Sequence, residues 1–278
     1  GLNLKSLSAS VYSMKIIKAD GTTLNISKNS SIQINNERLS LINFTNLSLG
    51  LLGIVTEITL ECEPMYYVRS EEKVVDLDFY LLHLNSWNRK YDFLKAWWFP
   101  HTDKAYVYLS SRITKEEFDV RKDEKYSADQ KKKDAEIDIK LAPLFKKSLT
   151  DATLIPKINQ DSLEIYFTDR IKYGTSMDML VHEETVPMVV SEYAITLEND
   201  QHLKALKEWK TYVDRKPQLH FPVDLRFTAQ EDSFLSTSYS EPVFHIGICV
   251  REHQGKEIPE IMQAFIRIMK KYDARPNW

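Results

Sequence analysis

The stretch that most constrains the fold is the alternating segment 221–228, Phe-Pro-Val-Asp-Leu-Arg-Phe-Thr. Successive side chains of a β-strand point to opposite faces, so its apolar residues share one face while Asp224 and Arg226 share the other. Two interpretations remain open. The pair is an exposed ion pair that contributes little to stability, or Arg226 is a fixed cation on a pocket floor, held by Asp224, that neutralises developing negative charge.

Composition narrows the range of functions. The chain has 278 residues and a net charge of −3, with both signs dispersed, so nucleic acid and acidic membranes are not expected as main partners. No apolar run is long enough to span a bilayer. The seven histidines form no His-x-x-x-His pair, and no metal site is expected. Cys62 and Cys249 lie far apart in apolar runs, which predicts buried free thiols.

Hydrophobic periodicity predicts strands and helices in mixed order, without a strict β-α-β alternation. The pattern favours an α+β fold with helices packed on one face of a largely antiparallel sheet. The charged segment 114–147 is typical of a solvated helical excursion, and 275–277 is typical of a turn. The predicted strands are 11–18, 22–26, 54–60, 68–76, 105–109, 163–167, 188–195, 221–228 and 243–250. The predicted helices are 37–46, 78–90, 201–213 and one that starts at Pro259.

Two glycines, Gly50 and Gly53, precede the strand at 54–60. They allow a tight bend and a close approach to the backbone. The close neighbour is either a ligand along exposed amides or the chain itself at a turn into a buried strand. Neither a Rossmann fingerprint nor a P-loop is present.

Two further features carry alternatives. The aromatic run Trp97, Trp98 and Phe99 predicts core packing, with room for one ring to line a pocket. His245 lies in the strand that follows 221–228. It is either a structurally satisfied histidine or a contact to the neighbouring strand.

Four stretches together resemble a known family. Residues 48–64 are similar to the strand that closes the flavin domain in vanillyl-alcohol-oxidase-type (VAO/PCMH) flavoproteins. Residues 98–103, 220–228 and 274–278 resemble segments of the aldonolactone oxidases. The resemblance runs from residue 1 to residue 278 in matching order.

The resemblance implies a two-domain organisation. Residues 1–66 are expected to be the C-terminal part of an FAD-binding domain, with the boundary near 65–68. Residues 67–278 are expected to be a substrate-binding cap domain with a large antiparallel sheet flanked by helices. The chain is therefore expected to be a fragment that lacks the phosphate-binding half of the flavin domain and the last tens of residues.

The resemblance also assigns roles to residues. Gly50 and Gly53 match the turn glycines of the family. Ile54 and Val55 match the strand whose backbone lies near the adenine end of FAD.

On the substrate side, Asp224 and Arg226 match the Glu-x-Arg pair beside the flavin ring, with His245 and Asn277 as further substrate-site residues. The family usually has Glu at the position of Asp224, and a side chain one methylene shorter moves the carboxylate by about a bond length. It usually has His at the position of Asn277.

The implied activity is FAD-dependent oxidation of a sugar 1,4-lactone (L-gulono-, L-galactono- or D-arabinono-lactone) at the alcohol next to the carbonyl. Oxygen is the expected acceptor, and the product is of the ascorbate type. Two alternatives are an alditol oxidase on the same scaffold and a non-catalytic binding or structural remnant. The segment 114–147 is charged where membrane-bound members of the family are apolar, so a soluble protein is expected. An intracellular location is also expected, but no sequence feature gives the compartment.

Overall fold

The computed structural model describes residues 2–121, 136, 139, 143–144, 146–148, 151–180, 188–216, 219, 222–251 and 260–277. The chain divides into two compact units, which we call the small and the large unit. The small unit contains Leu2–Pro64 and Thr228–Val243, and the large unit contains Met65–Phe227 and Phe244–Trp278. Expectations for Lys131–Lys133, His220, Phe221, Pro259 and Trp278 lie outside the described residues.

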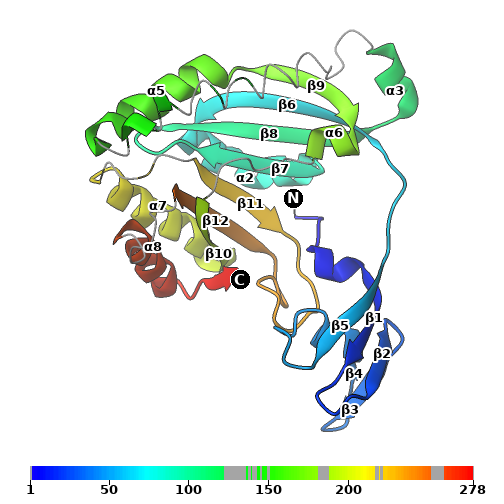
Figure 1. Cartoon of the computed structure of the whole chain (residues 1–278). Helices are drawn as coiled ribbons and strands as arrows, with labels where there is room; N and C mark the ends of the chain where they lie inside the picture. The colour runs from blue at the N-terminus through cyan, green and yellow to red at the C-terminus, as the bar shows by residue number, and fades with distance from the viewer. Residues whose placement is uncertain are drawn as a thin grey trace. The chain divides into compact units, whose positions relative to one another are not determined.

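The small unit contains a three-stranded sheet, a two-stranded hairpin and a short helix (Figure 1). The strand order of the sheet is β2-β1-β5, and β1 pairs antiparallel with both neighbours. The elements are β1 (Val11–Ile17), β2 (Thr23–Ser27), β3 (Ser31–Ile34), β4 (Glu37–Ser40), α1 (Leu41–Thr45) and β5 (Ile54–Leu60). The predicted strands at 11–18, 22–26 and 54–60 are confirmed. The core residues are Val11, Met14, Ile16, Ile26 and Ile42.

The helix predicted at 37–46 is wrong over its first half. Asn35 and Asn36 have φ angles of 48° and 67°, and two consecutive left-handed residues turn the chain back on itself. Strand β4 then pairs antiparallel with β3, and the helix starts only at Leu41. The two-asparagine turn decides the local structure, because it reverses the chain so that 37–40 pairs with β3.

A buried carboxylate ties the segment 228–243 to the rest of the small unit. Glu231 is 1% exposed and accepts hydrogen bonds from three serine hydroxyls. Ser6 Oγ donates to both carboxylate oxygens, at 2.7 and 2.8 Å, and Ser8 Oγ donates to Oε2 at 2.7 Å. The third donor is the hydroxyl of Ser236.

The large unit is built on a sheet of eight strands within the described residues, in the order β13-β10-β12-β11-β7-β8-β6-β9 (Figure 1). The pairs β13–β10, β11–β7, β7–β8, β8–β6 and β6–β9 are antiparallel. The strands are β6 (Tyr67–Asp76), β7 (Phe93–Trp98), β8 (Lys104–Ile113), β9 (Arg170–Thr175), β10 (Met188–Thr196), β11 (Val223–Thr228), β12 (Val243–Arg251) and β13 (Arg275–Asn277). The helices are α2 (Leu77–Lys90), α3 (Lys115–Val120), α5 (Ile155–Tyr166), α6 (Ser176–Leu180), α7 (Gln201–Val213) and α8 (Glu260–Lys271). The expected α+β class is confirmed.

One face of the large sheet is apolar and packs against helices. Phe244 of β12 contacts Phe227 of β11, with ring centroids 4.8 Å apart. Phe265 of α8 contacts Trp209 of α7 at 4.9 Å, and each buried ring of this kind contributes about 2 kcal/mol or more. Helix α2 covers the same sheet at β6, β7 and β8.

The helices are not confined to this apolar face, contrary to expectation, because Leu163 of α5 and the adjacent Phe167 pack against Tyr106 on the opposite face. The polar groups of the sheet lie on that second face, beside this contact.

Three assignments in the large unit are corrected. Residues 163–166 form the end of α5, with Phe167 as its C-cap, rather than a strand, because the buried positions of the segment recur at helical spacing. These buried residues are Ile155, Ile158, Asn159, Ser162 and Leu163. Residues 275–277, expected as a turn, form β13. Strand β7 is absent from the sequence prediction, since its run of Lys, Ala and Trp gives a weak alternating signal.

The cysteines also differ from expectation. Both are free thiols, but Cys62 is exposed and Cys249 is only partly buried. Cys62 follows β5, in which every residue is exposed, so the apolar run around it does not enter the core of the small unit.

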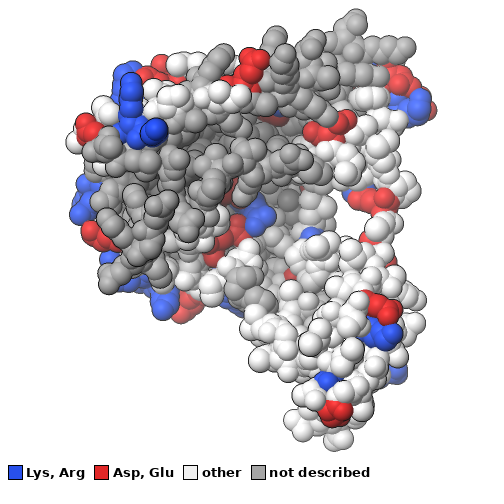
Figure 2. All heavy atoms as spheres, in the orientation of Figure 1, with Lys and Arg blue, Asp and Glu red and all other residues white. Residues whose placement is uncertain are grey.

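On the face shown in Figure 2, acidic and basic side chains of the described residues are interspersed. No helix of the described residues is long and apolar enough to cross a membrane.

Candidate active site

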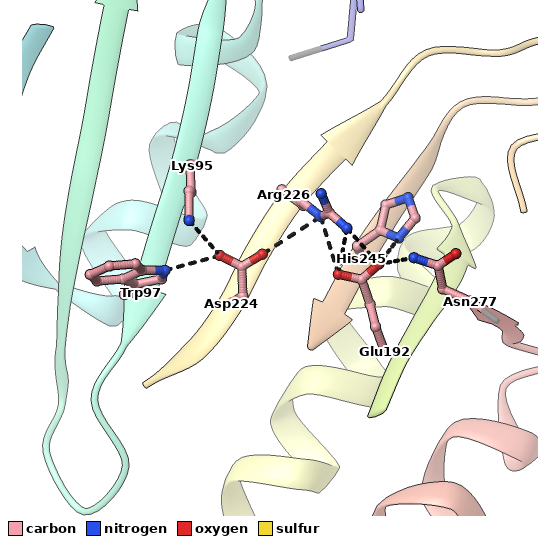
Figure 3. A network of polar contacts seen from close by, with 7 residues as sticks. All are labelled: Lys95, Trp97, Glu192, Asp224, Arg226, His245 and Asn277. Atoms are coloured by element: carbon pink, nitrogen blue, oxygen red, sulfur yellow. Dashed lines mark hydrogen bonds and ion pairs between the residues drawn. The ribbon is translucent and has the colours of Figure 1, made fainter. Parts of the chain in front are cut away.

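Strand β11 has the two faces that its alternation predicts. Its apolar residues are buried, while Asp224 and Arg226 lie on the opposite face (Figure 3). β11 is the fourth strand of the sheet, so this polar face is flanked on both sides by other strands. Side chains from neighbouring strands can therefore contact the pair.

The register of the sheet aligns polar residues into a row across five strands. Arg226 of β11 lies opposite Lys95 of β7, and Lys95 lies opposite Tyr108 of β8. Tyr108 lies opposite Glu72 of β6, and Glu72 lies opposite Arg170 of β9. Directly opposed residues share a face. The polar face is thus a continuous feature of the sheet rather than a property of β11 alone.

The strongest contacts of Arg226 are with Glu192 of β10. Its Nη2 donates to Oε1 at 2.7 Å and to Oε2 at 2.8 Å, and its Nε donates to Oε2 at 3.1 Å. Such a two-atom pairing of guanidinium and carboxylate fixes orientation as well as distance. Glu192 is 9% exposed, whereas the side chain of Arg226 is 45% exposed. The pair therefore anchors a cation that still reaches the surface of the sheet.

The missing side chain of Gly247 allows this pair to meet. Glu192 and Arg226 lie on strands separated by β12, and their side chains join above it. A Cβ on Gly247 would lie 3.3 Å from Glu192 Oε2 and 3.6 Å from Asp224 Cβ. A side chain at position 247 would therefore crowd the carboxylate of Glu192.

Asp224 plays a different part from the one expected. Its closest approach to Arg226 is 3.6 Å, from Oδ2 to Nε, which is too long for a strong hydrogen bond. Its Oδ1 accepts a hydrogen bond from Trp97 Nε1 at 3.0 Å and lies 3.5 Å from Lys95 Nζ. Glu192, not Asp224, is the main anchor of Arg226. Asp224 is instead held toward β7.

His245 is buried and contacts the same carboxylate. Its Nδ1 lies 3.0 Å from Glu192 Oε1. An ionised carboxylate only accepts hydrogen bonds, so Nδ1 carries the proton and donates it. Both interpretations of His245 meet here, because the histidine is buried and satisfied, and its contact joins two neighbouring strands.

Asn277 completes the group around Glu192. It lies directly opposite Glu192 in the β13–β10 pair, and its Nδ2 donates to Oε1 at 2.6 Å. The structure thus brings together Asp224, Arg226, His245 and Asn277, the four residues expected on the substrate side (Figure 3).

Charge within the group is nearly balanced. The carboxylates of Glu192 and Asp224 are opposed by the cations of Arg226 and Lys95. Burial acts to raise the pKa of Glu192, but hydrogen bonds from His245 and Arg226, with their charges, outweigh it and lower that pKa to about 2. Burial likewise acts to lower the pKa of Arg226, and the hydrogen bond and charge of Glu192, with the charge of Asp224, raise it. Both groups are ionised at neutral pH.

A second buried carboxylate lies at the far end of the row. Glu72 accepts from Arg170 Nε at 2.5 Å and from Tyr106 Oη at 2.8 Å, and Lys172 Nζ lies 3.3 Å away. Burial, followed by the charge of Glu72, raises the pKa of Tyr108, and the charge of Asp224 acts in the same direction. The phenol of Tyr108 therefore lies in the electric field of both carboxylates.

The predicted cofactor residues lie in the small unit. Gly50 and Gly53 have φ angles of 72° and 136°, values that favour glycine. A Cβ on Gly53 would lie 2.2 Å from the carbonyl oxygen of Ile17, so the close neighbour of this glycine is the chain itself. Ile54 and Val55 are exposed. They begin a strand whose other edge carries no pairing within the described residues.

Comparison with known proteins identifies the family. The family described as D-arabinono-1,4-lactone oxidase matches residues 58–278. The chain belongs to the D-arabinono-1,4-lactone oxidase family. The expected resemblance to the aldonolactone oxidases is thereby confirmed.

Relatives of this family align along the whole chain. L-gulonolactone oxidase of Mus musculus is 25% identical over 287 residues, which cover 100% of this chain and 61% of that relative. L-gulono-1,4-lactone dehydrogenase of Mycobacterium tuberculosis is 24% identical over 283 residues, covering 100% and 60%. The chain thus spans about 60% of the length of these curated relatives.

A solved structure gives the fold. The solvent-stable cholesterol oxidase has a TM-score of 0.67 at 15% identity, covering 98% of this chain and 58% of that chain. At this identity the likeness concerns the fold only.

Sequence reasoning missed two members of the site, Glu192 and Lys95, whereas Trp97 belongs to the aromatic run from which one pocket-lining ring was allowed. A single acidic residue within the apolar strand 188–195 was the available signal for Glu192, since buried carboxylates need partners. Among the described residues, no group of three or more His, Cys, Asp or Glu is placed to hold a metal.

Proposed function

We propose that the chain provides the substrate side of an FAD-dependent aldonolactone oxidase. The substrate is a sugar 1,4-lactone, such as L-gulono-, L-galactono- or D-arabinono-lactone, and the oxidised carbon is the secondary alcohol next to the carbonyl. Oxygen is the electron acceptor. Residues 1–66 form the last part of the FAD-binding domain, and residues 67–278 form the cap domain.

The observation that carries the proposal is the anchored cation Arg226. Oxidation by hydride transfer leaves negative charge on the group that accepts the hydride. A guanidinium that is already oriented stabilises such charge without reorganisation during the reaction. Arg226 meets this requirement, because Glu192 holds it through two nitrogens while almost half of its side chain stays exposed.

The residues present fit a flavin. A bound flavin would supply the hydride acceptor, and Arg226 would stabilise the negative charge that the acceptor gains. In the small unit, all seven residues of β5 are exposed, Ile54 by 72%. Within the described residues, one edge of this strand is unpaired. A strand with exposed apolar residues and an unpaired edge offers a surface on which a further chain segment and a cofactor can pack.

Two further residues would handle the lactone. The side chain of Asp224 is 25% exposed, and a carboxylate that accepts one hydrogen bond, from Trp97, and pairs with Lys95 can still accept a substrate hydroxyl. His245 donates from Nδ1 to Glu192, so the carboxylate that holds Arg226 also fixes the orientation of this ring in the site.

Replacement of Arg226 in the flavin-loaded full-length protein tests the proposal. Arg226→Ala should slow the bleaching of flavin absorbance by a lactone by about 100-fold or more. Arg226→Lys should recover part of the rate, since lysine keeps the positive charge but lacks the planar guanidinium that pairs with two oxygens. Arg170→Ala is the matched control, because it removes a guanidinium from the other buried carboxylate of the same sheet. An unchanged rate in Arg226→Ala would remove Arg226 from the site.

Substrate and acceptor are measured separately. Turnover of the three lactones is compared with that of open-chain polyols, and each assay is run with oxygen and with an artificial acceptor. Turnover of polyols alone would replace the lactone assignment by an alditol oxidase. Activity with the artificial acceptor alone would replace the oxidase assignment by a dehydrogenase.

A further inference from the structure

The geometry around Glu192 gives this residue a function of its own. We propose that Glu192 is the positioning residue of the site, which fixes the guanidinium plane of Arg226 and holds His245 with its proton on Nδ1. The kinetic consequence of this inference rests on the proposed function. The structural consequence does not.

The contacts of Glu192 require a group that only accepts hydrogen bonds. Its two oxygens receive bonds from Arg226 Nε and Nη2, His245 Nδ1 and Asn277 Nδ2. An ionised carboxylate offers about four lone-pair positions and no proton, so it can satisfy all of these donors at once. Glutamine, which has the same shape, would direct an NH₂ group at one of them.

Arg226 has no equivalent second anchor among the described residues. Asp224, the nearest other carboxylate, stays 3.6 Å from Nε. An arginine side chain free of its anchor samples several rotamers, and a displacement of about 1 Å can cost on the order of 100-fold in rate. The two-atom contact with Glu192 removes that freedom.

The position of the proton on His245 follows from the same carboxylate. Among the residues drawn in Figure 3, Glu192 of β10 contacts this ring and Arg226 of β11 contacts the same carboxylate, while Asn277 of β13 is neutral. A carboxylate 3.0 Å from Nδ1 selects the Nδ1–H form. In that form Nε2 is the ring nitrogen that carries no proton.

The fold makes room for this arrangement. Strands β10 and β11 are not neighbours, and two steps of about 4.8 Å separate them. The side chains of Glu192 and Arg226 span this distance over Gly247, where a Cβ would lie 3.3 Å from the carboxylate.

Nuclear magnetic resonance of the chain labelled with ¹⁵N-histidine tests the structural part. In the wild type, the ¹⁵N shifts of His245 should report a single tautomer with Nδ1 protonated. The population with Nδ1 protonated should no longer dominate in Glu192→Gln and should be partly retained in Glu192→Asp. It should be unchanged in Asp224→Asn, which is the matched control. If Glu192→Gln does not fold, as judged by thermal unfolding, Glu192→Asp and Gly247→Ala carry the comparison. A wild-type tautomer in every folded variant would overturn the proposal.

Kinetics of the flavin-loaded full-length protein test the second part. Glu192→Gln should slow flavin bleaching by about 10- to 100-fold and change KM little, because the residue acts through Arg226 and His245. Asp224→Asn should mainly raise KM. Equal rates in Glu192→Gln and the wild type would overturn the positioning role. If no lactone is oxidised by the wild type, the proposed function fails, while the tautomer result still decides the structural role of Glu192.

Discussion

Glu192 in the large unit and Glu231 in the small unit are both buried carboxylates, but their partners differ in kind. Glu192 is bound by a guanidinium, an imidazole and an amide. Within the described residues, the groups that contact the carboxylate of Glu231 are the hydroxyls of Ser6, Ser8 and Ser236. One carboxylate is matched by opposite charge, and the other only by neutral donors.

This difference distinguishes a candidate active site from a contact that only stabilises the fold. Charge-assisted bonds orient a cation and leave its outer surface able to act on another molecule. Hydroxyl donors satisfy a carboxylate and connect two chain segments, but they present no charge to the outside. Partly exposed Arg226 lies beside Glu192, whereas the serines around Glu231 serve the packing of the 228–243 segment. The comparison predicts that Glu231 affects stability only, and Glu192 both stability and reaction.

The largest effect is expected for Glu231→Ala. Three hydroxyls lose their acceptor at about 1–1.5 kcal/mol each, so the free energy of unfolding should fall by about 4 kcal/mol. Urea unfolding measures the loss, and hydrogen exchange should place it in the small unit. Ser238→Ala is the control, because this buried hydroxyl contacts Ser236 rather than the carboxylate. If both variants lost the same unfolding free energy, Glu231 would not be the residue that holds the 228–243 segment.

A pH-dependent loss of stability comes next. The pKa of Glu192 is lowered from 4.5 to about 2, so its contribution is complete above pH 4.5 and is lost as the pH falls through about 2. This lowering of the pKa corresponds to about 3 kcal/mol of stability. Other carboxylates titrate there too, so the quantity to measure is the difference in unfolding free energy between the wild type and Glu192→Gln. A difference that stays constant from pH 5 to pH 2 would contradict the assigned charge pairing.

The sequence could predict the faces of β11 but not the anchor of Arg226. Alternation over 223–228 is local, and it places Asp224 beside Arg226 without any knowledge of the rest of the chain. The contact with Glu192 joins residues 34 positions apart. It depends on the strand order β10-β12-β11 and on a glycine in the middle strand, and neither follows from local periodicity. The nearest carboxylate in sequence was therefore mistaken for the anchor.

The same limit explains the errors in secondary structure. Residues 163–167 look like a strand when taken alone, and only the spacing from Ile155 onward shows a helix. Strand β13 has three residues and exists through its pairing with β10, so a turn was the local prediction. Long elements with a clear period, such as 201–213, are predicted within a residue of their ends. Short elements defined by their neighbours are not.

A smaller effect is expected for Arg226→Lys. The ammonium keeps the charge opposite Glu192 but cannot form the two-atom contact, so the unfolding free energy should fall by about 1 kcal/mol. The hydrogen bonds between Glu231 and its serine partners should not change in this variant. Hydrogen exchange that slows or accelerates in the small unit of this variant would break the distinction between the two carboxylates.

The smallest effect is expected for Asn277→Ala. The amide donates one bond to Glu192 from the edge strand β13, and Arg226 and His245 remain to match the charge, so the loss should be about 0.5 kcal/mol. Asn277→Asp reverses the sign of the contact by placing a second carboxylate 2.6 Å from the first, and it should cost several times more. Thermal unfolding of the two variants at neutral pH gives the ratio. If both lose the same amount, Asn277 supports β13 by packing alone and is not part of the charge-matched group around Glu192.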